Sequence, residues 1–150
     1  MNNVDAITLM NRLIVTSKNG ESALRAASEE AYHEDLKQSL LGYSRFLGEA
    51  AHDLQEAVRR LGGKPQELGT FGNTLHRTWM HLTVTALGRD EDEILDQVEP
   101  DEATAEKRLA EAVTWETPPE VHALLERQYE NARKHHSEIR ELRERLHTVH

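Results

Sequence analysis

The fold follows from one stretch, residues 35–63, which reads DLKQSLLGYSRFLGEAAHDLQEAVRRLGG. Its apolar side chains recur every three or four residues, the spacing of an α-helix with one buried face. They are Leu36, Leu40, Tyr43, Leu47, Ala50, Leu54, Val58 and Leu61. Gly62 and Gly63 follow the last of them, and glycines in this position are typical of a helix C-terminus. The stretch therefore predicts a long amphipathic helix over residues 35–61.

The same periodicity predicts three further long helices, over about 4–32, 90–115 and 118–146. The predicted inward positions are Ile7, Met10, Ile14, Ser17, Glu21, Leu24, Ser28 and Ala31 in the first of these; Leu95, Val98, Glu102, Ala105, Leu109 and Ala112 in the second; and Val121, Leu125, Gln128, Ala132, His135 or His136, Ile139, Leu142 and Leu146 in the third. Each set forms a single stripe, as expected for helices that share one core.

Short signals set the ends of the last two helices. Asp90 with Glu93 forms a capping-box pattern, and Thr117-Pro118-Pro119-Glu120 forms a second one with proline in the first turn. Pro100 lies inside the helix over 90–115, where it removes one hydrogen bond. Because the apolar stripe keeps its phase across Pro100, we expect a kink rather than a break.

The segment between the second and third long helices differs from the rest. Residues 64–72 read as a loop, and residues 74–87 read as a shorter helix with Leu75, Trp79, Leu82 and Ala86 on one face. The chain is therefore two helical hairpins joined by one long crossover over about residues 62–89. A single long crossover is the ferritin-like connectivity. We predict an all-α, ferritin-like antiparallel four-helix bundle that forms one domain over residues 1–150.

Composition excludes several classes of function. The net charge is −9, which argues against a nucleic-acid partner because such a partner needs a basic surface. No cysteine is present, so disulfides, thiolate metal sites and cysteine nucleophiles are excluded. No apolar run reaches the length of a membrane span, and the N-terminus lacks a signal-peptide pattern. We expect a cytoplasmic protein that does not enter a membrane.

Several motifs in order resemble one bacterial family. They are Asn19-Gly20-Glu21, Leu61-Gly62-Gly63, Leu75-His76-Arg77-Thr78-Trp79-Met80, the pair Glu99 and Glu102, Arg127-Gln128-Tyr129, and His136 followed by Ile139 and Leu142-Arg143. Together they resemble a ferritin-like family of unknown function, domain of unknown function 2383. The resemblance implies a bundle related to ferritins but no established activity. Through that superfamily it implies iron or another divalent metal, in oxidation of the metal or peroxide handling during stress or iron storage.

Ionisable residues interrupt the inward stripes. Glu21, Glu102 and His136 (or His135) take core positions, where an unpaired carboxylate costs several kcal/mol. If helices one and four run opposite to helices two and three, all three residues lie roughly 15–18 Å from the same end at about 1.5 Å per residue. Two carboxylates and an imidazole at one level are what a metal site in a bundle core requires.

A complete ferritin-type di-iron site is not predicted. Such a site needs a Glu on two helices and Glu-x-x-His on the other two. Glu49 and His52 have this spacing, but their helical phase directs them largely outward, and Arg133 replaces the second motif's Glu. We therefore regard Glu49, His52 and Glu99 as weaker candidate ligands beside Glu21, Glu102 and His136.

Two functions remain open from the sequence. The first is a bundle that binds one or two iron ions, or another divalent metal, in its core. The second is a metal-free bundle in which Glu21, Glu102, Gln128 and His136 form a buried polar network, and which acts by self-association or through a protein partner. In either case we expect a homodimer or a higher homo-oligomer, and the sequence does not decide whether the protein is an enzyme.

Overall fold

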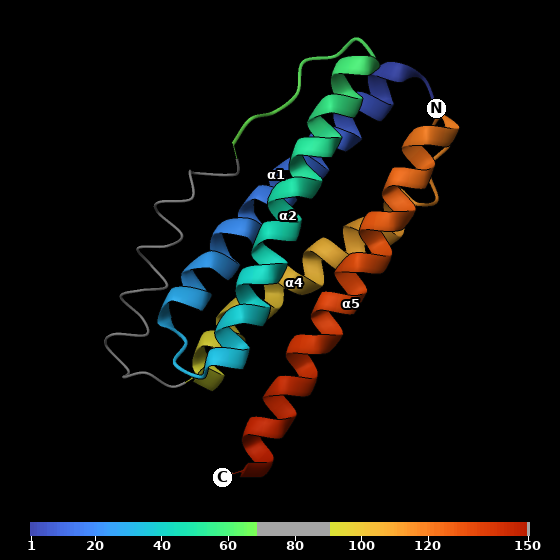
Figure 1. Ribbon diagram of the computed structural model, residues 1–150. Helices are drawn as coiled ribbons and strands as arrows, with labels where there is room; N and C mark the ends of the chain where they lie inside the picture. Colours follow the sequence, from blue (N-terminus) through green and yellow to red (C-terminus); the bar gives the residue numbers. More distant parts are fainter. Residues whose placement is uncertain (69–90, 150) are drawn as a thin grey trace.

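The computed structural model describes residues 1–68 and 91–149 and contains four long helices (Figure 1). They are α1 (Asn3–Glu30), α2 (Glu34–Arg60), α4 (Glu91–Ala112) and α5 (Pro119–Val149). No strand occurs among these residues, so the predicted all-α four-helix bundle is confirmed. The predicted short helix over 74–87, with Leu75, Trp79, Leu82 and Ala86, and the Asp90 cap lie outside the described residues.

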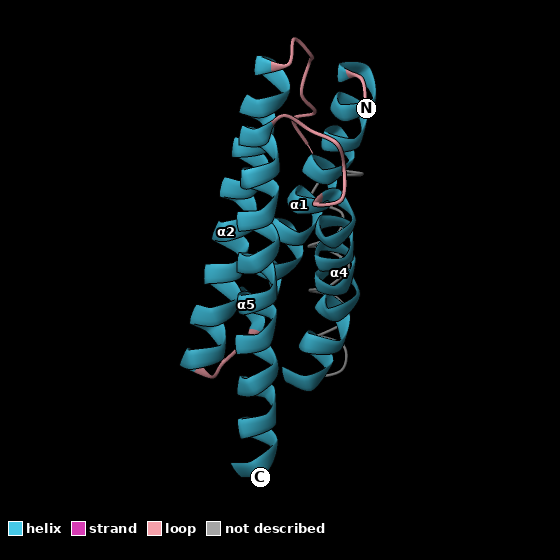
Figure 2. Cartoon of the chain, turned by 90° about the vertical axis from the view of Figure 1, so that its right-hand side faces the viewer, coloured by secondary structure: helices cyan, strands magenta, loops and turns pink. Residues whose placement is uncertain are grey.

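The helices form a ring in which neighbours are antiparallel. α1 packs against α2 and α4, and α5 packs against the same two helices, so that α1 lies diagonally opposite α5. α2 and α4 run in the same direction, with the end of α2 and the start of α4 at opposite ends of the bundle (Figures 1 and 2). This arrangement is the connectivity of a ferritin-like bundle, in which one connection spans the length of the molecule.

The apolar core consists of two clusters, one towards each end of the bundle. One contains Leu24, Leu36, Leu40, Tyr43, Leu47, Ile94, Val98, Ile139 and Leu142 with several alanines. The other contains Met10, Leu13, Ile14, Leu54, Val58, Leu109, Val121, Leu124 and Leu125 with further alanines. On α1, α4 and α5 the residues between the two clusters include the buried polar side chains of Ser17, Glu102 and His136. A polar layer thus separates two apolar ends.

α1 and α2 approach each other closely because small residues line their contact. A Cβ atom on Gly20 would lie 2.6 Å from Cδ1 of Leu47, and one on Gly48 would collide with the Glu21 carboxylate. Ser44 on α2 donates a hydrogen bond to the backbone oxygen of Glu21 at 2.7 Å. These contacts fix the face of α1 that carries Glu21 against α2.

The ends of the helices show which sequence signals correctly predicted where a helix begins or ends. α2 ends as predicted: Gly62 adopts a φ of 87°, and the amide of Gly63 donates to the carbonyl of Val58 at 3.0 Å. The predicted Thr117 cap is wrong, because α5 begins at Pro119 and the buried Thr117 hydroxyl has no hydrogen-bond partner. Pro100 lies inside α4, which continues on both sides of it, so the helix does not break there.

None of the described helices combines the length and the apolar character needed to cross a bilayer.

Candidate metal centre

Three ionisable side chains meet between α4 and α5. Glu99 and Glu102 of α4 and His136 of α5 each offer one ligand atom, and these atoms lie within 4.8 Å of one another. The Nε2 atom of His136 is 3.2 Å from Oε1 of Glu99 and 3.5 Å from Oε2 of Glu102. Two carboxylates and an imidazole therefore converge on one small volume in the polar layer of the bundle.

Helical spacing explains why three carboxylates lie on the same side of α4. Glu99, Glu102 and Glu106 are separated by three and four residues, which places all three along one side of α4. Glu102 lies on the buried stripe, whereas Glu99 and Glu106 flank it and keep 49 % and 29 % of their side chains exposed. The group is thus closed at Glu102 and open to solvent at Glu99.

Glu106 holds the imidazole of His136 in place. Its Oε2 atom lies 2.7 Å from Nδ1 of His136, on the far side of the ring from Glu99 and Glu102. When Nδ1 donates its proton to Glu106, the lone pair of Nε2 is directed at the other two carboxylates. A carboxylate that orients a histidine through its second nitrogen is the usual partner of a metal-binding imidazole.

Glu102 is the most enclosed of the three carboxylates. Only 1 % of its side chain is exposed, and its Oε1 atom has no hydrogen-bond partner. Burial, the charge of Glu99, a hydrogen bond with Glu99 and the charge of Asp101 raise the pKa of Glu102 to about 8, against a smaller opposing effect of Arg140. Without a cation, this carboxyl group therefore holds a proton at neutral pH.

Tyr43 of α2 is fully buried, and the charges of this group act on it. Its hydroxyl is buried without a hydrogen-bond partner, and its ring stacks on the His135 ring with centroids 5.1 Å apart. Burial first, and then the charges of Glu102, Glu106 and Glu99, raise the pKa of Tyr43 well above its usual range. The negative potential of the group thus reaches an unpaired hydroxyl across the core.

The distances from the imidazole of His136 to the two carboxylates are close to those between two ligands of one metal ion. Two ligand atoms about 2.1 Å from an ion lie roughly 3.0–3.4 Å apart at octahedral or tetrahedral angles. The distances of 3.2 and 3.5 Å from Nε2 of His136 to Glu99 and Glu102 are close to this range. The unpartnered oxygen of Glu102 is a further donor. The residues therefore fit a metal ion in both geometry and donor type.

A hollow of about 500 Å³ lies on the α5 side of the group, next to His136. Glu106 and His136 form part of its wall, and Arg140 and Ser137 lie beside them. The hollow is also lined by Arg133 and Lys134, whereas the exposed carboxylate of the ligand group is that of Glu99.

The structure separates the other predicted ligands from this group. The carboxylate of Glu21 faces α2 and pairs with Lys18 at 3.6 Å and Arg25 at 3.3 Å. Glu49 and His52 are exposed on α2, as their helical phase predicted. Of the two alternatives on α5, His136 is the buried one, and the ring of His135 stacks on those of both Tyr43 and Phe46.

Two members of the site were missed in the sequence. Glu106 lies outside the apolar stripe of α4, but its spacing of four residues from Glu102 was a usable signal. Tyr43 fits the apolar stripe of α2 and lies in one of the apolar clusters, and no sequence signal indicates that the charges of Glu102, Glu106 and Glu99 act on its hydroxyl.

A family model matches most of the chain. The profile of a family described as Domain of unknown function (DUF2383) matches residues 5–115, a range that contains α2, α4, α1 from its third residue onward and the three glutamates of the site. His136 lies beyond the matched range. No curated protein matches the chain.

Proposed function

We propose that this chain, which belongs to the DUF2383 family, binds one divalent metal ion between α4 and α5 through Glu99, Glu102 and His136. The observation that carries the proposal is the buried, unpartnered Oε1 atom of Glu102 beside a second carboxylate and an oriented imidazole. A buried carboxylate oxygen without a partner is costly, and a bound cation removes that cost.

The charge of the site supports a divalent ion. Glu99, Glu102 and Glu106 bring three carboxylates to a single histidine. A histidine supplies two N–H groups at most and one positive charge at most, so it cannot satisfy all three. A divalent ion bound to Nε2 neutralises Glu99 and Glu102 while Glu106 keeps the proton of Nδ1.

The donor set narrows the choice of metal. Carboxylate oxygen with imidazole nitrogen and no thiolate suits Fe²⁺, Mn²⁺ and Zn²⁺ better than soft ions such as Cu⁺. We take iron as the first candidate because the ferritin-like connectivity is shared with iron proteins, which is an argument by analogy. A metal ion with open coordination positions supplies Lewis acidity and, if it is iron, one-electron redox chemistry.

The test is titration of the chelator-stripped protein with Fe²⁺ under anaerobic conditions, and in parallel with Mn²⁺ and Zn²⁺, by calorimetry and elemental analysis. We expect about one ion per chain, and we expect His136→Ala to abolish binding. His52→Ala is the matched control, since His52 is an exposed histidine on α2 outside the site. Absence of binding by the wild-type chain, or equal loss in both variants, would refute the proposal.

One observation favours the metal-free alternative. The imidazole of His136 already contacts Glu106, Glu99 and Glu102, so a protonated His136 could serve as the centre of a structural network. In that case the titration shows no uptake, and the function lies in self-association or a protein partner. Sedimentation equilibrium tests the proposed homo-oligomer independently of the metal.

A further inference from the structure

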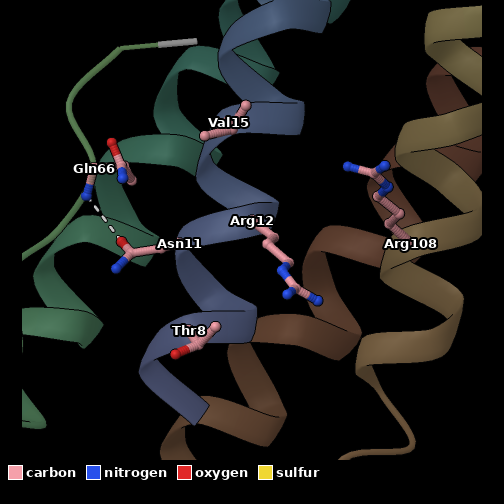
Figure 3. A pocket seen from close by; sticks show the side chains of 6 residues that line it. All are labelled: Thr8, Asn11, Arg12, Val15, Gln66 and Arg108. Atoms are coloured by element: carbon pink, nitrogen blue, oxygen red, sulfur yellow. Dashed lines mark hydrogen bonds between the residues drawn. The ribbon is translucent and has the colours of Figure 1, made fainter. Parts of the chain in front are cut away.

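We propose that Arg12 of α1 and Arg108 of α4 bind a phosphate group in a hollow that contains none of the candidate metal ligands. The hollow has a volume of about 360 Å³ and is lined by Thr8, Asn11, Arg12, Val15, Gln66 and Arg108 (Figure 3). Its wall carries two guanidinium groups and no carboxylate, in a chain with 27 acidic and 18 basic residues.

Among the described residues, neither arginine is paired with a carboxylate, although Glu111 follows Arg108 by three positions. No acidic residue occurs between Asp5 and Glu21, so Arg12 has no carboxylate three or four positions away on its own helix. Within residues 1–68 and 91–149, neither Arg12 nor Arg108 forms an ion pair. In the part of the chain that the structure describes, this arginine pair has no ion-pair partner and is therefore available to an external anion.

The two guanidinium groups approach the same space from different helices. Figure 3 shows Arg12 extending from α1 towards α4 and Arg108 extending from α4 towards α1. Nη1 of Arg108 donates to the Thr16 hydroxyl at 2.5 Å, which holds this side chain against α1. A guanidinium group has five donors, so one contact leaves most of them free for a ligand.

The opposite wall of the hollow is also anchored. Asn11 donates to the carbonyl of Lys64 at 3.2 Å and accepts from the amide of Gln66 at 2.8 Å, a contact drawn in Figure 3. The carbonyl of Gln66 accepts from Gln55 of α2 at 2.8 Å. These bonds tie the chain after α2 to α1 and give the hollow a fixed edge beside the arginines.

Phosphate is the anion that this arrangement fits best. A guanidinium fork binds two oxygens of one phosphate, and a tetrahedral phosphate offers oxygens to two forks from different directions. The volume lies near the lower end for small-molecule pockets, so the ligand is inorganic phosphate or a small phosphomonoester. Both sources present the same chemistry to the arginines.

The test is calorimetric titration of the metal-stripped chain at low ionic strength, first with inorganic phosphate and then with glycerol phosphate. Removal of metal prevents phosphate from binding through an ion, so the result is independent of the proposed metal function. We expect saturable binding that Arg12→Gln weakens by about tenfold or more, the loss of one charge-assisted pair. Tighter binding of glycerol phosphate would identify an organic phosphate as the ligand, and equal or weaker binding would identify inorganic phosphate.

Two further variants separate a site from general charge attraction. Arg12→Lys keeps the charge but lacks the planar fork, and we expect it to bind phosphate more weakly than the wild type and more tightly than Arg12→Gln. Arg45→Gln removes one exposed arginine of α2 outside the hollow and should bind as the wild type does. Absence of wild-type binding, or equal loss in Arg45→Gln and Arg12→Gln, would overturn the proposal.

Discussion

Glu21 and Glu102 are both glutamates on the inward stripe of a long helix, yet their surroundings are opposite. Glu21 lies at the α1–α2 contact with Lys18 three residues before it and Arg25 four residues after it, and it pairs with both. Glu102 lies at the α4–α5 contact with carboxylates, Glu99 and Glu106, at the same two offsets. One glutamate is satisfied by its own helix, and the other is not.

This difference shows what separates a structural carboxylate from a candidate ligand. An inward position alone does not distinguish Glu21 from Glu102, but the charges three and four residues away do. Cations at these offsets complete an ordinary ion pair. Carboxylates there concentrate negative charge, and that excess must be removed by a proton, by a histidine or by a metal ion.

The largest expected effect is on metal binding by matched variants of these two glutamates. Glu102→Gln removes a buried anionic ligand and should weaken binding by about 100-fold or more, a loss of roughly 2.7 kcal/mol. Glu21→Gln removes the same charge at the α1–α2 contact and should leave the affinity unchanged. Competition titration against a fluorescent chelator measures both. Equal losses would mean that the two carboxylates share a site, contrary to the structure.

A smaller loss of metal affinity is expected when the orientation of the His136 imidazole is disturbed. Glu106→Ala removes the acceptor 2.7 Å from Nδ1 and should weaken metal binding by about 10–100-fold, the usual cost of losing such a partner. The same titration measures it, with Glu111→Ala, an exposed position on α4, as the control. Unchanged affinity in Glu106→Ala would show that Glu106 does not orient a ligand.

The dependence of folding stability on pH should differ between the wild type and Glu102→Gln. Folding raises the pKa of Glu102 from 4.5 to about 8, so between these values the folded chain keeps a proton that the unfolded chain has lost. The metal-free protein should therefore lose stability as the pH rises from about 4.5 to about 8. Glu102→Gln cannot ionise and should be the more stable form at pH 9 by about 1–3 kcal/mol, but not at pH 4. Urea unfolding at both values checks this, and a constant difference would contradict it.

The smallest expected effects concern the packing of α1 against α2. Gly20→Ala places a methyl group 2.6 Å from buried Leu47 and should destabilise the chain by about 1–2 kcal/mol, after the gain in helix propensity. Gly42→Ala meets nothing within 4 Å and should stabilise it by about 0.5–1 kcal/mol. Thermal unfolding of both variants measures the pair, and destabilisation by both would refute the close approach as the cause.

The fold was predictable because each helix carries a continuous apolar stripe. The stripe of α2 and the signal at Gly62 were sufficient to place that helix within about one residue of the observed ends. The cap at Thr117 failed because two prolines follow it, and Pro118 takes the position at which a capping side chain would act. Local capping patterns are reliable only when the neighbouring backbone is free to adopt them.

The candidate site was predictable only in part because depth along a helix does not give direction around it. Glu21, Glu102 and His136 were placed at one level, but α1 lies diagonally opposite α5 and the Glu21 carboxylate faces α2. Glu99 and Glu106 flank the stripe of α4, and only the packing of α5 against α4 shows that both reach His136.

The most direct test of the central claim is an anomalous-scattering map from crystals of the full chain grown with Mn²⁺ or Fe²⁺. The account predicts one strong peak about 2.0–2.3 Å from Nε2 of His136 and from carboxylate oxygens of Glu99 and Glu102, with Glu106 still bonded to Nδ1. A map without a peak there, with Nε2 of His136 hydrogen-bonded to the carboxylates, would contradict it and leave the group as a structural network.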